Sequence, residues 1–214
     1  MTRQRVAVIF GGRSGEHEVS LVSARSVMAA LDPSLWEAVP IGVTRTGSWL
    51  TPEATRTALE RAGRAFSGQG GSLLTSGAAL AALAECDVAF PLIHGTNGED
   101  GTLQGFLELA DMPYAGAGVA ASAIGLDKAF MKALFREAGV PVANYGVLRA
   151  WEVNGDGAAA RDYVEQTIGY PCFVKPANGG SSVGITHVRS REDLGAAFEA
   201  AFAYDDKVVV EEEI

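Results

Sequence analysis

The fold is decided by the stretch Asp87-Val-Ala-Phe-Pro-Leu-Ile-His-Gly-Thr-Asn-Gly-Glu-Asp-Gly-Thr-Leu-Gln-Gly105. Its first seven residues are mostly apolar, as in a buried strand of a parallel sheet. From Leu103 to Met112 the apolar residues recur at helical spacing. A glycine-rich turn with His94 and two carboxylates lies between them. This order predicts a ligand-binding loop at the carboxyl edge of an open α/β sheet, although a turn without function would also tolerate these polar residues.

Bulk composition narrows the class of protein. The 214 residues suit two small domains, and 48% hydrophobic with 20% charged residues is ordinary for a globular protein. A net charge of -9 disfavours nucleic acid or an anionic membrane as a partner. We find neither a run of about 20 apolar residues nor a signal-peptide pattern. Cys86 and Cys172 are isolated, as are the three histidines, so we expect a cytoplasmic α/β protein without a zinc site.

The first half of the chain alternates strands and helices, which predicts a parallel sheet. We expect strands at Arg5–Phe10, Trp36–Val43 and Asp87–Ile93 and a helix that starts near Glu16 and ends before Asp32-Pro33. The Gly/Ser-rich run Ser67–Ser72 is interpreted as a surface excursion. Residues 1–119 are predicted to form the N-terminal domain.

The second half predicts a mixed α+β domain over residues 120–214. Asp127 precedes a helix at Lys128–Phe135, which Gly139-Val-Pro141 ends. Further strands are expected at Val142–Leu148, Pro171–Lys175, Gly184–Val188 and Lys207–Glu211, and further helices at Ala158–Thr167 and Arg191–Ala203. The chain stops at Ile214 on the exit of a strand, from which we expect a further domain to be missing.

The segment from Phe173 to Gly184 carries a possible anion site. Lys175 ends a strand, and Gly179-Gly180-Ser181-Ser182 follows in a predicted hairpin tip. Backbone N–H groups of small residues can surround phosphate oxygens, and a lysine supplies a point cation. No Walker loop is present, and a hairpin without a ligand explains the pattern as well. Lys128 lies in the first turn of a helix, where a cation is unfavourable unless an anion binds nearby.

Residues 11–23 form a glycine-rich turn followed by Glu16, His17, Glu18 and Ser20. Acids at a helix N-terminus complement its dipole, and Glu16 could alternatively hold a substrate ammonium group. The glycine order is not G-x-G-x-x-G, and the second strand does not end in an acid that could bind ribose. An oxidoreductase is therefore disfavoured.

Three segments together resemble a known family. Gly11 through Ser23, His94 through Gly105 and Val174 through Gly184 are similar to the signatures of D-alanine–D-alanine ligases, which belong to the ATP-grasp superfamily. Tyr114-Ala-Gly-Ala-Gly118 and Asp127-Lys128 follow in the order that this family shows. The resemblance implies a Rossmann-like pre-ATP-grasp domain over 1–119 and a central ATP-grasp subdomain over 120–214, with the C-terminal ATP-grasp subdomain absent.

The resemblance also implies a reaction and a partner set. ATP phosphorylates one D-alanine, and the amine of a second attacks the acyl phosphate to form the dipeptide for peptidoglycan synthesis. Mg²⁺ is implied, with ligands expected beyond residue 214 and none in this chain. A homodimer through the N-terminal domain is implied too, and we expect these 214 residues alone to be inactive.

The resemblance assigns roles residue by residue. Glu16, His94 and Ser20 match groups around the first D-alanine, and Ser181 matches the lid serine that contacts Glu16. The groups matched to ATP are Lys128, Lys175, Gly180, Ser181, Ser182, Glu211 and Ile214, the last two at the adenine hinge. Glu212 and Glu213 make this hinge more acidic than in some relatives.

Two alternatives stay open at this point. A D-alanine–D-lactate ligase would share the same chemistry, because the residues that choose the nucleophile are expected outside this chain. A nucleotide-binding module without catalysis would bind ATP but not D-alanine.

Overall fold

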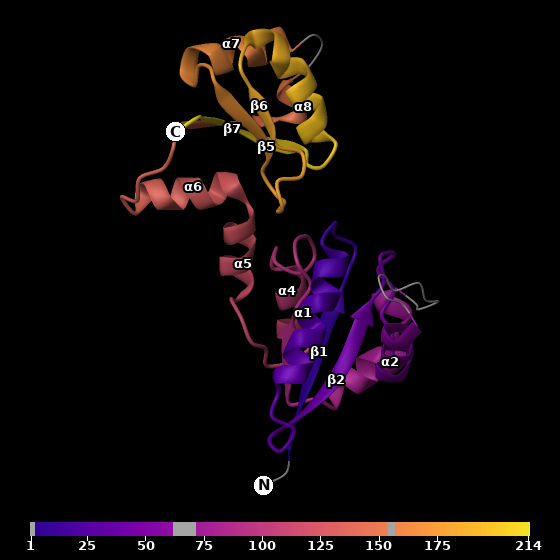
Figure 1. The fold of residues 1–214 in the computed structure, drawn as a ribbon. Coiled ribbons are helices and arrows are strands. Elements are labelled where there is room, and N and C mark those ends of the chain that lie inside the picture. Colours follow the sequence, from indigo (N-terminus) through magenta and orange to yellow (C-terminus); the bar gives the residue numbers. More distant parts are fainter. Residues whose placement is uncertain (1–2, 62–71, 154–156) are drawn as a thin grey trace. The chain divides into compact units, whose positions relative to one another are not determined.

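The computed structural model describes residues 3–61, 72–153 and 157–214 (Figure 1). The chain divides into two compact units, Met1–Ala123 and Ile124–Ile214. The predicted surface excursion at Ser67–Ser72 lies almost wholly outside the described residues. In the part of the chain that is described, no helix has the length and apolar character needed to cross a bilayer.

The N-terminal unit is built on a three-stranded sheet. Its strands have the order β2-β1-β3, and both pairs are parallel. Its elements are β1 (Gln4–Gly11), α1 (His17–Ala30), β2 (Trp36–Val43), α2 (Pro52–Arg61), the 3-10 turn η1 (Leu73–Thr75), α3 (Gly77–Ala84), β3 (Val88–Pro91) and α4 (Thr102–Leu109). The predicted parallel α/β sheet is confirmed.

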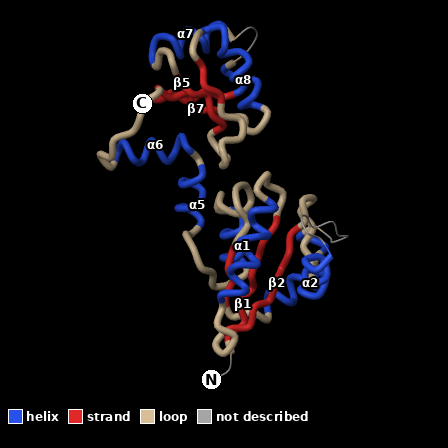
Figure 2. The backbone as a smooth tube through the Cα atoms, in the orientation of Figure 1, coloured by secondary structure: helices blue, strands red, loops and turns tan. Residues whose placement is uncertain are grey.

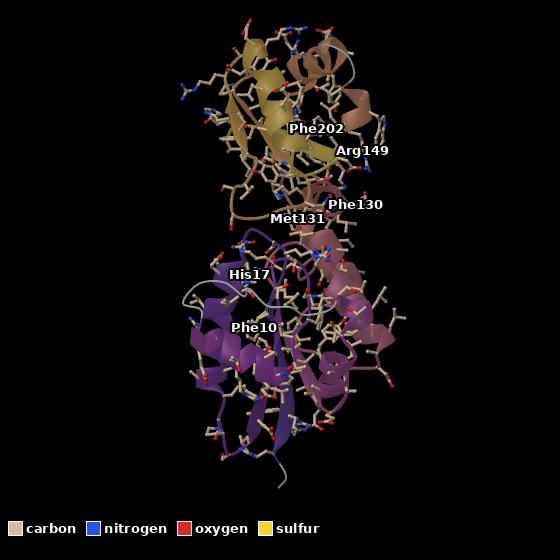
Figure 3. The ribbon with its side chains drawn as sticks, turned by 90° about the vertical axis from the view of Figure 1, so that its right-hand side faces the viewer. Phe10, His17, Phe130, Met131, Arg149 and Phe202 are labelled. Carbon is tan, nitrogen blue, oxygen red and sulfur yellow. The ribbon has the colours of Figure 1, made fainter. Side chains whose placement is uncertain are left out.

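Both faces of this sheet are covered by helices. On one face, Val6, Val8 and Phe10 of β1 pack with Leu21 of α1 and with partly buried residues of α2. On the other face, Ala7 and Ile9 pack with buried residues of α3 and α4. Alternate side chains of β1 thus enter two different cores, which is why the strand is apolar throughout. Phe10, labelled in Figure 3, is fully buried in the first core.

Helices α2 and α3 were not predicted from the sequence. Helix α3 is Gly-Ala-Ala-Leu-Ala-Ala-Leu-Ala, without a polar face that would reveal a period. Helix α5 (Val119–Leu126) carries the division between the two units, at Ala123, four residues after the predicted limit at 119.

The C-terminal unit is built on an antiparallel sheet with the strand order β4-β7-β5-β6. Helices α7 and α8 lie on one side of this sheet and α6 lies on the other (Figure 2). Its elements are α6 (Lys128–Glu137), β4 (Tyr145–Arg149), η2 (Ala150–Glu152), α7 (Ala158–Thr167), β5 (Cys172–Pro176), β6 (Thr186–Val188), η3 (Arg191–Asp193), α8 (Leu194–Phe202) and β7 (Lys207–Glu212). The predicted mixed α+β character is confirmed.

Strand β7 separates two sets of contacts. Val208 and Val210 belong to the core under α7 and α8, whereas Val209 packs with Ala129 of α6 on the opposite face. Because strand side chains alternate between faces, Lys207 and Glu211 share the face of Val209. These two charged side chains of β7 are therefore directed to the side of α6.

The start of α6 is held by a buried ion pair. Asp127 Oδ1 accepts hydrogen bonds from the backbone N–H groups of Ala129 and Phe130, which caps the helix. Asp127 Oδ2 contacts Lys207 Nζ, and both side chains are only 7% exposed. Lys207 Nζ also lies 4.4 Å from the centre of the Phe130 ring.

We expect Asp127→Asn to destabilise the C-terminal unit by about 3–5 kcal/mol, because the amide keeps the cap but leaves the Lys207 ammonium buried without its counter-ion. Urea unfolding measures the loss. The control is Arg191→Gln, since Arg191 pairs with Asp162 and Glu165 at the surface. That change should cost about 1 kcal/mol or less. Equal costs for the two variants would contradict the expectation.

Candidate functional site

Two loops meet at the carboxyl edge of the parallel sheet. Strands β1 and β3 are neighbours, so the turn at residues 12–16 and the loop at residues 92–101 leave the sheet at the same edge. Gly11 makes the first turn possible: its φ is +94°, and an added Cβ would lie 2.2 Å from Val43 O. Only glycine fits this backbone without displacing β2.

Glu16 and the His94 loop come together at this edge. A Cβ added to Gly95 would lie 3.2 Å from Glu16 Oε2, so the carboxylate lies against the loop backbone. The His94 side chain is 27% exposed. Its Nε2 is 3.0 Å from Ser23 Oγ on α1, and its Nδ1 is 3.4 Å from Glu99 Oε1. The ring is thereby oriented from both sides, by Ser23 on α1 and by Glu99 in its own loop.

Glu99 and Asp100 order the loop. Glu99 Oε2 accepts a hydrogen bond of 2.9 Å from Gly95 N. The two oxygens of Asp100 accept hydrogen bonds from Asn97 N and Thr102 N at the start of α4. Both carboxylates are therefore hydrogen-bonded to the backbone of the loop that they order.

Ser20 has a different position from the expected one. Its side chain is fully buried, and its Oγ donates to Leu92 O and accepts from Gly11 N, at 2.5 and 2.7 Å. In this arrangement the hydroxyl links the turn after β1 to the loop after β3. His17, labelled in Figure 3, is also fully buried, with Nδ1 2.7 Å from Gly12 O. Both residues are part of the framework of the turn.

The C-terminal unit contains a pocket of about 380 Å³ beside a cluster of charges. Lys175 Nζ contacts Glu211 Oε1, and Lys132 Nζ of α6 lies 2.8 Å from Glu211 Oε2. Because β5 pairs with β7, Lys175 and Glu211 are diagonal neighbours on one face of the sheet. The residues lining the pocket are Ala143, Phe173, Lys175, Ile185, Glu211, Glu212 and Ile214. The lining of the pocket thus combines an aromatic ring, apolar side chains and a lysine.

Lys128 is directed inward rather than to solvent. Its Nζ donates to Gly179 O at 2.8 Å and to Ala177 O at 3.4 Å, at the base of the β5–β6 hairpin. Burial lowers the pKa of this ammonium group, and the nearby charge of Lys175 lowers it further. An anion placed between the two lysines would relieve their repulsion.

The hairpin tip is exposed and has an unusual backbone. Gly180, Ser181 and Ser182 are all exposed, and the two serines have φ values of +53° and +60°. Positive φ is unfavourable for residues with side chains, and it recurs at ligand-binding loops. The predicted hairpin with a polar tip is confirmed. Ser181 and Glu16 belong to different units, so the predicted link between them stays a prediction.

The carboxyl group of Glu211 remains ionised in this cluster. Burial by itself raises its pKa, but the hydrogen bonds and charges of Lys132 and Lys175 outweigh burial, so the pKa is lowered from 4.5. At the hinge beyond it, Glu212 Oε1 accepts a hydrogen bond from Asn144 N, and Glu213 Oε1 is 3.4 Å from His187 Nε2. The two additional acids therefore have partners of their own.

This lowered pKa predicts a pH dependence. Because the folded-state pKa lies below the unfolded one, the stabilisation is fully present above 4.5 and is lost as the pH falls through the folded value. We expect Glu211→Gln to be less stable than the unsubstituted protein near neutral pH, and this difference to shrink on acidification below 4.5. Urea unfolding of both proteins across the range measures it. A difference that stays constant with pH would contradict the assignment.

The described residues contain no group of three or more histidine, cysteine or acidic side chains arranged to hold a metal ion. Cys86 and Cys172 are both buried free thiols, and burial raises the pKa of Cys172 to about 11.

Lys132 and Ser23 are site residues that the sequence analysis missed. Lys132 follows Lys128 by four residues, so the two lie on one face of α6, and this spacing could have indicated it. Ser23 follows Glu16 at the end of the first signature, but its contact with His94 depends on the pairing of β1 with β3. No local pattern shows that contact.

The fold and the site together define a two-unit α/β protein in which one unit has a carboxylate–histidine site and the other has a lysine cluster. Two family models match: the D-ala D-ala ligase N-terminus over residues 5–117 and the D-ala D-ala ligase C-terminus over residues 134–214. The chain belongs to the D-alanine–D-alanine ligase family, which is a family of enzymes.

Relatives support this membership over nearly the whole chain. The D-alanine–D-alanine ligases of Geobacillus thermodenitrificans and Mycobacterium avium are 46% and 45% identical over 99% and 98% of the chain. The chain spans about 61% and 60% of the length of these two relatives. Among solved structures, the VanG D-Ala:D-Ser ligase of Enterococcus faecalis is similar with a TM-score of 0.80 at 34% identity, covering 100% of this chain and 63% of its own. D-alanyl-alanine synthetase A of Vibrio cholerae has a TM-score of 0.78 at 29% identity, covering 100% and 61%.

Proposed function

We propose that the whole protein joins two D-alanine molecules at the expense of ATP for peptidoglycan precursor synthesis. The observation that carries the proposal is the pair of sites: Glu16 beside the His94 loop in one unit, and Lys128 with Lys175 in the other. One site suits an amino acid and the other suits the phosphates of a nucleotide. We infer D-alanine as the substrate from the relatives named D-alanine–D-alanine ligase.

The reaction is a two-step acyl transfer. A carboxylate oxygen of the first D-alanine attacks the terminal phosphorus of ATP, which gives D-alanyl phosphate and releases ADP. The amine nitrogen of the second D-alanine then attacks the acyl carbon and loses a proton, and the tetrahedral intermediate expels inorganic phosphate. The protein contributes mainly positioning and electrostatic stabilisation to such a reaction.

In the N-terminal unit, Glu16 holds the ammonium group of the first D-alanine, and His94 lies beside the same substrate. Ser23 and Glu99 hold the imidazole ring of His94, so the orientation of this ring is set before the substrate binds. In the C-terminal unit, Lys128 and Lys175 bind ATP phosphates, and Gly180, Ser181 and Ser182 form a lid over them. Glu211 and Ile214 bind adenine in the pocket beside Phe173.

Mg²⁺ is expected with ATP, since a divalent ion neutralises phosphate charge in phosphoryl transfer. The described residues do not supply a cluster of ligands for it. The same proposal assigns residues 1–119 to the amino acid and residues 120–214, as an ATP-grasp subdomain, to the nucleotide. It also describes the protein as a cytoplasmic homodimer with ATP and D-alanine as its ligands.

The test is a product assay with the whole protein. ATP, D-alanine and magnesium should yield D-alanyl-D-alanine, ADP and phosphate in equal amounts. Supplying D-serine or D-lactate with D-alanine decides the second substrate, because the similar VanG structure is a D-Ala:D-Ser ligase. ATP binding without any D-alanine binding, measured by calorimetry, would refute the ligase and support a non-catalytic nucleotide-binding module.

A further inference from the structure

One carboxylate in the C-terminal unit is shared by two lysines from different elements. Glu211 of β7 contacts Lys175 of β5 through Oε1 and Lys132 of α6 through Oε2, the latter at 2.8 Å. The three side chains are 14%, 19% and 12% exposed, so water screens these charges only weakly. The arrangement places one more cation at Glu211 than its charge requires.

The two lysines face different surroundings. Lys175 Nζ lies 5.3 Å from the centre of the Phe173 ring, and both residues line the pocket of about 380 Å³. Lys132 does not line that pocket, and its Nζ lies 5.3 Å from the centre of the Tyr145 ring. Lys175 can therefore meet a ligand in the pocket, whereas Lys132 contacts Glu211 from the side of α6.

A phosphate that takes Lys175 would remove one partner from Glu211. Leaving a mostly buried carboxylate without a cation costs free energy, and this cost would weaken the binding of the phosphate. A carboxylate that retains a second ammonium group avoids most of the cost. The presence of Lys132 thus decides whether Lys175 is available to a ligand.

We propose that Lys132 is a positioning residue that keeps Glu211 paired when Lys175 leaves it for a nucleotide phosphate. The inference rests on the proposed function, because it assumes that Lys175 binds ATP. It differs from a structural salt bridge in one respect. A structural role would affect every ligand of the pocket alike, whereas this role concerns only ligands that carry phosphate.

The experiment compares the affinities of the whole protein for ATP and for adenosine, measured without D-alanine so that no turnover occurs. We expect Lys132→Met to weaken ATP binding about tenfold, the loss of roughly one charge-assisted hydrogen bond. Adenosine binding should change less than about twofold, since it needs no phosphate contact. Lys132→Arg retains the cation and should restore most of the ATP affinity.

A double substitution separates the two roles further. In a Glu211→Gln background no carboxylate holds Lys175, so adding Lys132→Met should have no further effect on ATP binding. Arg136→Met is the matched control: it removes a cation one turn later on α6 that also lies over the Tyr145 ring, 5.2 Å from its centre. It should leave both affinities unchanged.

The outcomes distinguish the two claims. If the unsubstituted protein does not bind ATP, the proposed function fails and this inference fails with it. If the unsubstituted protein binds ATP, two results would overturn only the inference. Lys132→Met could weaken the affinities for ATP and adenosine equally, or it could change neither affinity. An undiminished tenfold loss in the Glu211→Gln background would overturn it as well.

Discussion

Lys175→Met should reduce the affinity of the whole protein for ATP about 100-fold and abolish most of its turnover. The Met side chain keeps most of the apolar stem but lacks the ammonium group that we assign to the phosphates, and a hydrogen bond to a charged partner contributes about 1.5–3 kcal/mol. Lys128, which we also assign to the phosphates, is anchored at its own position by Gly179 O and Ala177 O, so it does not replace the ammonium group that is lost. Calorimetry with ATP and a product assay measure the two effects.

The control for Lys175 is Arg189→Met, which removes one cation from an exposed position of the same unit. General attraction between a basic surface and ATP would weaken binding in both variants. We expect no change in the control. An Lys175→Met protein with unaltered ATP affinity would show that the phosphates bind elsewhere.

Glu16→Gln should lower kcat/KM for the first D-alanine about 100-fold while ATP affinity stays the same. The amide has the shape of the carboxylate but not the charge that pairs with a substrate ammonium group, which is again worth roughly 2–3 kcal/mol. ATP binding is spared because the lysine cluster lies in the other unit. Initial rates at varied D-alanine and calorimetry with ATP provide the two measurements.

Glu18→Gln is a matched control for Glu16. The two acids are two residues apart, but Glu18 pairs with Arg45 at the surface and is 44% exposed. Its substitution should change kcat/KM less than about twofold. Equal effects at both positions would indicate a general electrostatic influence and remove Glu16 from the site.

Much of the fold was predictable because its strands have strong local signals. Trp36–Val43 and Ala158–Thr167 were predicted with the limits that β2 and α7 have in the structure. Apolar runs bounded by glycine, proline or polar residues account for this success. Helix α3 has no polar face, so its sequence lacks the period that identifies a surface helix.

The candidate site was predictable in its residue types but not in its contacts. Glu16, His94 and Lys175 each follow or end a predicted strand, where ligand-binding residues of α/β proteins concentrate. Ser20 was assigned to the substrate from its place in the signature, yet it is buried beneath the loops. The burial of Ser20 depends on which strands pair, and strand pairing cannot be read from the residues next to Ser20 in the sequence.

The sequence by itself determined the two-unit α/β plan, the polar loop after the strand at Asp87–Ile93 and the polar hairpin tip. These features follow from residue periodicity and from the conformational preferences of glycine and short polar side chains, which act over a few residues. Only the tertiary structure decided that Asp127 is buried against Lys207 and that Glu211 lies between Lys132 and Lys175. Each of these contacts joins residues 36 to 80 positions apart, so it exists only after strand pairing and helix packing have removed the charges from water.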